Sequence, residues 1–181
     1  MKYVKETFER LSRGGFISSD SSQERDKHIF MDIEDHLTDY QQYFAQIGFM
    51  LEQGNGYFYF SRKENKVQVV DKLQRFGHWI DILDFLKAWE PAFGPGFTFS
   101  EAALTIKIEA DIDLQQKASE LYEKKDKYPE IVEKLVDEMQ KMGFLELADE
   151  KSGLYKVVTA YSYLEEMVNL ITIDASDEIS Q

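Results

Sequence analysis

The sequence predicts an α+β fold that is mainly helical and divided into two similar units. Three observations support this prediction. Apolar residues recur at helical spacing over most of the 181 residues, a glycine follows two of these helical stretches, and two short strand-like segments with a turn between them follow each glycine. With 43% hydrophobic and 14% aromatic residues, the chain has enough apolar surface to bury a core.

The first unit is predicted to contain a helix, an exposed loop rich in glycine and serine, a second helix and an aromatic two-stranded hairpin. In chain order, these elements are expected at residues 3–11, 14–22, 32–47 and 49–60. Gly48 stands where a left-handed residue would end the second helix. The turn signal Gly54-Asn55-Gly56 joins the two strands of the hairpin.

A long helix is predicted next, because helical apolar spacing continues from Val67 to Trp89. More than twenty residues is long for a helix in a domain of this size, so we expect it to connect the two units. Pro91, Gly94 and Pro95 then break the pattern and indicate a domain boundary. The predicted division is therefore residues 1–90, residues 91–172 and an acidic flexible tail.

The second unit is predicted to contain three helices, a hairpin and a final helix. Ser100 is placed to cap the first helix, Pro129 stands in the first turn of the third helix, and Gly143 follows that helix. The expected elements cover residues 101–106, 112–121, 129–142, 144–147, 154–158 and 161–171, and the flexible tail is residues 173–181.

An internal repeat relates the two units. A shift of 95 residues superimposes Leu37 on Val132, Gly48 on Gly143 and Phe49 on Phe144, among other positions of the same kind. Helices, a recognition-type helix and a two-stranded β wing form the layout of a winged-helix unit. The sequence thus predicts tandem winged-helix units, each with helices and a two-stranded β wing.

Charge limits which partners this fold can take. The chain carries 34 acidic and 21 basic residues, a formal net charge of -13, which disfavours indiscriminate coating of nucleic acid, so any DNA contact must be a local basic patch. The first recognition-type helix, residues 32–47, has no lysine or arginine, and we expect it to bind protein.

The second recognition-type helix is the better candidate for DNA. Acidic residues on the same helix offset its lysines, so we expect a weak contact with double-stranded DNA, or one made only within a complex. The candidates include two basic residues at the end of the first wing, where a wing rests against phosphates. They are Arg62, Lys63, Lys124, Lys125, Lys127, Lys134 and Lys141.

Aromatic residues supply the candidate protein contacts. The run Tyr57-Phe58-Tyr59-Phe60 could stack on bases, but alternating strand geometry buries at least two of the four, which favours core and partner interface. Trp79 and Trp89 are expected in the core or in a dimer contact. The interface candidates are Tyr57, Tyr59, Trp79 and Trp89.

No catalytic or cofactor motif stands out. The chain has no cysteine, and its three histidines, His28, His36 and His78, fall in separate predicted elements. His78 with Asp81 or Asp84 could form an acid–base pair, although a surface hydrogen bond is the simpler interpretation. The pairs Asp111/Asp113 and Glu165/Glu166 have polar neighbours and are interpreted as solvated faces. The sequence predicts no enzyme activity, no metal and no cofactor.

Membrane association is not predicted either. No stretch approaches the roughly 18–20 apolar residues that a bilayer-spanning helix requires, and the segment Met1–Glu6 has no apolar signal core. We therefore expect a cytoplasmic protein.

Several segments, taken in order, resemble the MukE/MksE family of accessory subunits of bacterial condensin-like complexes. They are residues 8–15, 43–62, 99–101 and 135–144, together with the long connecting helix. The resemblance implies a tandem winged-helix homodimer that binds a kleisin subunit (MukF/MksF-like) and, through it, an SMC ATPase (MukB/MksB-like). It implies a nucleoid-associated role in chromosome condensation and segregation or in plasmid exclusion.

The resemblance also implies DNA contact at the two ends of the second recognition-type helix, where Lys127 and Lys141 lie. Gln140 departs from the family, in which a second basic residue can precede Lys141. Two alternatives stay open. One is a winged-helix transcriptional regulator, which would need a basic recognition helix, and the other is a hydrolase, which would need a buried carboxylate or histidine in a cleft.

Overall fold

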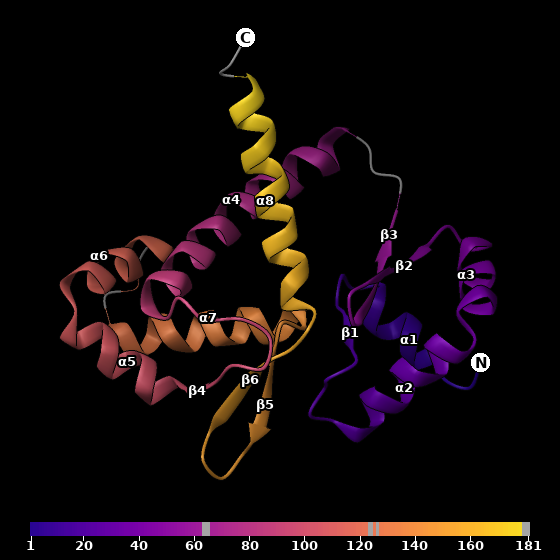
Figure 1. Ribbon diagram of the computed structural model, residues 1–181, viewed down its shortest axis with the longest axis horizontal. Coiled ribbons are helices and arrows are strands. Elements are labelled where there is room, and N and C mark those ends of the chain that lie inside the picture. The colour runs from indigo at the N-terminus through magenta and orange to yellow at the C-terminus, as the bar shows by residue number, and fades with distance from the viewer. Residues whose placement is uncertain (63–65, 123–124, 126, 179–181) are drawn as a thin grey trace.

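A computed structural model (Figure 1) describes residues 1–62, 66–122, 125 and 127–178, with residues 66–75 and 170–178 described as backbone. Helices make up 57% and strands 16% of the chain. The fold is therefore α+β and mainly helical, as predicted. The candidates Lys63 and Lys124 lie outside the described residues.

The first unit has the element order of a winged helix. Its elements are α1 (Val4–Leu11), β1 (Ile17–Ser18), α2 (Glu24–Asp35), α3 (Leu37–Ala45), β2 (Met50–Gly54) and β3 (Tyr57–Ser61). The predicted hairpin forms from β2 and β3, and β1 pairs antiparallel with β3, so the sheet has the order β1-β3-β2. The wing is thus part of a three-stranded sheet.

Two predictions for this unit were wrong. Residues 14–22 are not simply an exposed loop, because Phe16, Ile17 and Ser18 are buried and Ile17–Ser18 form β1. A strand of two residues is too short to show alternation in the sequence. The helix predicted over 32–47 is two helices, since the backbone leaves helical geometry at His36, with φ -127° and ψ 30°.

The second unit repeats this order after the long helix. Its elements are α4 (Lys66–Trp89), β4 (Thr98–Ser100), α5 (Glu101–Ala110), α6 (Ile112–Leu121), α7 (Tyr128–Met142), β5 (Leu145–Asp149), β6 (Leu154–Val157) and α8 (Tyr161–Glu178). The sheet order is β4-β6-β5, again antiparallel. Since β4 precedes α5 as β1 precedes α2, both units carry the third strand.

Predicted helix ends are confirmed where a specific residue defines them. The Ser100 hydroxyl accepts a hydrogen bond from the Ala103 amide at 3.2 Å, which caps α5. Gly48 and Gly143 both have φ of 82°, a left-handed geometry that favours glycine. The last helix is longer than predicted: α8 continues to Glu178 and so includes most of the segment 173–181 expected as a flexible tail.

Two apolar cores hold the molecule together. The smaller core lies within the first unit and includes Leu11, Ile33, Tyr40, Phe44 and Phe58. The larger core is formed by α4 to α8, and Phe16 and Tyr57 enter it from the first unit. The two units therefore share buried surface.

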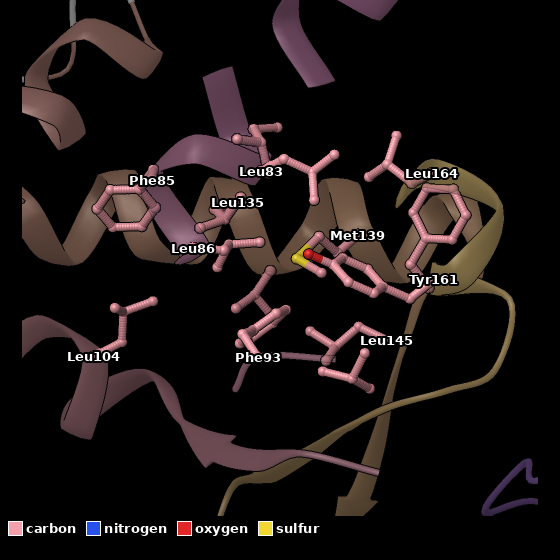
Figure 2. Close-up of a cluster of buried hydrophobic side chains, with 14 of the residues drawn as sticks. Leu83, Phe85, Leu86, Phe93, Leu104, Leu135, Met139, Leu145, Tyr161 and Leu164 are labelled. Atoms are coloured by element: carbon pink, nitrogen blue, oxygen red, sulfur yellow. The ribbon is translucent and has the colours of Figure 1, made fainter. Parts of the chain in front are cut away.

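The second half of α4 packs with the C-terminal helices (Figure 1). Figure 2 shows Leu83 and Leu86 of α4 beside Leu135 and Met139 of α7, and all four belong to the larger core. Tyr161, at the start of α8, points into the same cluster. This half of α4 therefore packs as part of the second unit. The domain boundary after residue 90 stays a prediction.

Candidate interaction surfaces

The helix α7 stands in the recognition position of the second unit. Pro129 lies in its first turn, where a missing amide proton costs no helical hydrogen bond, and Gly143 ends it. One side of the helix is buried, through Ile131, Val132, Leu135, Val136 and Met139. The charged residues are thereby left on the opposite, outward side.

Each described lysine of this surface lies beside a carboxylate. The Nζ–Oε distances are 3.4 Å from Lys125 to Glu130, 3.5 Å from Lys127 to Glu130 and 3.9 Å from Lys134 to Glu138. Lys141 Nζ lies 2.6 Å from the Asp137 carboxylate. Such exposed pairs stabilise a fold little, but they cancel the local positive potential that would attract phosphate.

Lys134 is also part of a packed polar cluster between α4 and α7. Its Nζ lies 4.1 Å above the centre of the Tyr122 ring, and the Tyr122 hydroxyl donates to Glu138 Oε2 at 3.0 Å. The same carboxylate lies 3.0 Å from His78 Nε2. Burial, assisted by Glu138, raises the pKa of the Tyr122 hydroxyl. Lys134 is therefore less available to DNA than Lys127 or Lys141.

The histidine and carboxylates considered for catalysis have structural partners. His78 contacts Glu138 rather than Asp81 or Asp84. The Asp111 carboxylate caps α6 by accepting hydrogen bonds from the amides of Asp113 and Leu114. Glu165 pairs with Lys87 at 2.8 Å, and Glu166 accepts a hydrogen bond from Tyr57. These contacts give structural roles to His78, Asp111, Glu165 and Glu166.

Neither a metal site nor a membrane span is found in the part of the chain that the structure describes. There, no group of three or more histidine, aspartate or glutamate side chains is arranged to hold a metal ion. Likewise, no helix within the described ranges combines the length and the apolar character needed to cross a bilayer.

The aromatic strand β3 lies between the two units. Its alternation directs Phe58 and Phe60 to the smaller core and Tyr57 and Tyr59 to the larger one. Tyr57 and Phe58 are 1% and 0% exposed, which agrees with the prediction that at least two of the four residues are buried. Tyr59 packs on Tyr163 of α8, with ring centres 4.9 Å apart.

The tryptophans pack against the larger core. Trp79 meets Phe144 edge to face, with ring centres 5.4 Å apart, and keeps part of its surface exposed. Trp89 contacts Phe93, Phe97 and Phe99. Of the four candidate interface residues, Tyr57 has the least surface to offer a partner, while Tyr59, Trp79 and Trp89 remain partly exposed.

A polar seam between the units was missed in the sequence. The serine-rich segment 18–22 contacts the second sheet: the Ser22 amide donates to the Glu146 carboxylate at 2.5 Å, and Asp20 accepts from the Thr159 amide at 2.8 Å. Lys156 lies 3.2 Å from the Asp20 carboxylate. These partners are more than 120 residues apart in the chain, and no local pattern could have connected them.

Three exposed apolar residues lie close together in the chain, at the end of α3, the recognition-position helix of the first unit, in the turn that follows it and at the start of β2. Tyr43, Ile47 and Met50 are 46%, 53% and 56% exposed. The helix itself carries no lysine or arginine. Exposed apolar side chains beside a helix without cations are typical of protein contacts rather than of DNA contacts.

Two winged-helix units joined by one long helix, with a shared core, define a tandem winged-helix protein. Residues 2–168 match the model of the family described as condensin complex protein MksE. Because the match covers both units, the chain belongs to this family and is a subunit of a condensin-type complex. No curated protein matches the chain.

Proposed function

We propose that the protein is a non-enzymatic accessory subunit that dimerises, binds the kleisin of a condensin-like complex and assists that complex in engaging DNA. The match to the MksE family, which extends over residues 2–168, carries the proposal. The complex would act in the cytoplasm, at the nucleoid, in chromosome segregation or in exclusion of plasmids. ATP hydrolysis would be the task of the SMC partner.

The surface of α3 supports the protein-binding part of the proposal. Tyr43 on this helix, Ile47 just after it and Met50 at the start of β2 are exposed apolar side chains, and a partner that covers them removes apolar surface from water. The helix presents Asp39 and no cation, so phosphate would be repelled. A second copy of the chain or the kleisin are the partners we expect there.

The surface of α7 supports an auxiliary role on DNA. Lys127 and Lys141 stand at the two ends of the helix and are 77% and 73% exposed, although each pairs with a carboxylate. An isolated chain of net charge -13 should therefore hold duplex DNA weakly. In a complex whose other subunits bring DNA close, the same lysines would add a contact.

Light scattering coupled to size-exclusion chromatography tests the proposal. The protein alone should have the mass of a dimer, and addition of its kleisin should shift it into a stoichiometric complex. A monomer whose elution does not change with kleisin would refute the function. A duplex DNA bound tightly and in a sequence-specific way by the protein alone would favour a transcriptional regulator instead.

A further inference from the structure

A cleft of about 540 Å³ lies between the two winged-helix units. One wall comes from the first unit, through the end of α1, the α1–β1 loop and the wing residues Tyr59–Arg62. The other comes from α4, the α7–β5 corner and the start of α8, through Phe76, Trp79, Met142, Phe144, Tyr163 and Leu164. The volume falls within the range of ligand sites in proteins.

The lining is aromatic and held in place by its own packing. Phe16 lies at its centre, with ring centres 5.2 Å from Phe144, 5.7 Å from Tyr59 and 5.1 Å from Tyr163. Phe16 and Phe144 are buried, whereas Tyr59, Tyr163 and Trp79 are only partly buried. The aromatic side chains are therefore already in position, and a ligand can contact them without a rearrangement of the cleft.

The charge of the cleft is opposite to that of the protein. Among its described lining residues, the charged side chains are Arg13 and Arg62, both exposed, and none is a carboxylate. The whole chain, by contrast, has 34 acidic and 21 basic residues. The guanidinium of Arg62 lies 5.0 Å from the centre of the Phe49 ring, at the edge of this aromatic surface.

Two carboxylates near Tyr59 have partners of their own. Glu52 and Glu166 both raise the pKa of the Tyr59 hydroxyl, after the larger effect of burial. Glu52 accepts a hydrogen bond from the Ser61 hydroxyl at 2.7 Å, and Glu166 accepts one from Tyr57 at 3.3 Å. Neither belongs to the lining, so the two arginines determine the charge of the lining residues that the structure describes.

A neighbouring hollow has a different charge pattern, so the arginine-only charge of the described lining is specific to the cleft. The hollow has about 450 Å³ and shares Arg13 and Phe16 with the cleft. Its lining mixes both signs, with Glu9, Arg10, Asp26, Lys141 and Glu146 among its members. Arg10 there is already paired with Asp26. Of these two hollows, the cleft is the one whose described lining combines aromatic residues with arginines and includes no carboxylate.

We propose that this cleft binds an extended acidic peptide segment in which large apolar side chains alternate with or flank carboxylates. The apolar side chains would cover the aromatic lining, and the carboxylates would pair with Arg13 and Arg62, whose planar guanidinium groups suit bidentate contact. The inference rests on the proposed function, because it takes the segment to be part of the kleisin.

Single-stranded nucleic acid fits the same cleft less well. A groove for single strands needs positive charge along the whole phosphate backbone and open ring faces for base stacking. Here the described part of the lining offers two cations, and its rings are packed against one another, as in the Tyr59–Tyr163 and Phe16–Phe144 contacts. A short acidic peptide requires no more than this.

The double variant Arg13→Glu/Arg62→Glu tests the proposal in the full-length protein. Titration calorimetry with the kleisin should give an affinity about tenfold weaker than that of the wild type, which corresponds to about 1.4 kcal/mol. The matched control is Lys107→Glu/Lys151→Glu, which makes the same charge change at two exposed lysines outside the cleft. The control should bind within about twofold of the wild type.

Overlapping fluorescent 15-residue peptides of the same kleisin then identify the bound segment. The tightest peptide should be acidic, contain at least two large apolar residues and lose affinity with the arginine variant. Equal kleisin binding by wild type and arginine variant would overturn the cleft while leaving the proposed function intact. Preference for basic peptides, or tighter binding of oligo(dT) than of any peptide, would also overturn it. A wild-type protein that does not bind the kleisin at all would refute the proposed function.

Discussion

The helices α3 and α7 occupy the same place in two copies of one fold, yet their outward surfaces differ. α3 exposes Tyr43, is followed by the exposed Ile47 and carries no lysine or arginine, whereas α7 exposes lysines that alternate with carboxylates. Their buried sides are alike, since both pack apolar residues against a sheet and end at a left-handed glycine. The fold thus determines which residues a recognition helix buries, whereas the exposed residues of the helix determine which partner it can bind.

The largest expected effects come from the buried sides, where the two helices should behave alike. Phe44→Ala in α3 should lower the free energy of unfolding by about 3–5 kcal/mol, and Met139→Ala in α7 by about 2–5 kcal/mol. Both residues are 0% exposed, so each truncation leaves a cavity. Urea unfolding followed by circular dichroism measures both. A loss below about 1 kcal/mol at either site would contradict the packing described for that unit.

The exposed side of α3 should matter for partners rather than for stability. The double variant Tyr43→Ala/Ile47→Asp should weaken association with a second copy or with the kleisin by about tenfold or more, because exposed aromatic anchors dominate such contacts. Light scattering over a concentration series measures the change. Ile106→Asp/Ile112→Asp, on exposed residues of the second unit, is the control. Equal association of the two variants would remove α3 from the contact.

Removal of the carboxylates that pair with the lysines of α7 should make this helix bind DNA better. Glu130→Gln/Asp137→Asn removes the carboxylates beside Lys127 and Lys141. Binding of a 20-base-pair duplex at low salt should rise severalfold, because unpaired lysines release more counterions from DNA. Fluorescence anisotropy measures it. The same neutralisation on the first unit, Glu34→Gln/Asp39→Asn, should leave binding nearly unchanged, since α3 has no lysine or arginine and those of α2 lie at the opposite end of that helix from Glu34; a comparable gain there would contradict the local charge argument.

The smallest expected effect is a change in how stability depends on pH, and it concerns Asp32, near the end of α2 and just before α3. Burial alone would raise the pKa of Asp32, but hydrogen bonds from the Tyr40 hydroxyl and the amides of Lys2 and Tyr3 outweigh it and lower the pKa. A carboxylate whose pKa is lowered by folding stabilises the protein at every pH above its pKa in the unfolded chain, about 3.9. This stabilisation is lost as the pH falls through the pKa of the folded state.

The variant Asp32→Asn should therefore lose less stability than the wild type between pH 5 and pH 2, as measured by thermal unfolding across that range. Asp35→Asn is the control, because Asp35 is exposed at the end of the same helix. Identical pH profiles for wild type and Asp32→Asn would show that the hydrogen bonds to this carboxylate do not stabilise the fold.

Sequence patterns predicted the elements with local signals. Gly48, Gly143, Ser100 and Pro129 each define a helix end through backbone geometry or capping, and each prediction is confirmed. The strands β1 and β4 were not predicted, because they are two and three residues long and form only by pairing with distant strands. The break at His36 was missed because the apolar stripe continues across it.

The surfaces were harder to predict than the elements. Lysine positions on α7 and the pairing of Lys134 with Glu138 one turn away follow from its sequence, but the contact of Lys134 with the Tyr122 ring depends on how the end of α6 meets α7. The cleft joins residues as distant as Arg13 and Tyr163. Such contacts depend on how the units pack, and the repeat alone does not determine that packing.

Native mass spectrometry of the protein co-expressed with its kleisin and SMC ATPase tests the central claim most directly. The account predicts an assembly that contains all three proteins, with this chain present as a dimer and lost when the kleisin is left out. A kleisin–ATPase complex that forms without this chain bound, while the chain remains a free monomer, would contradict it.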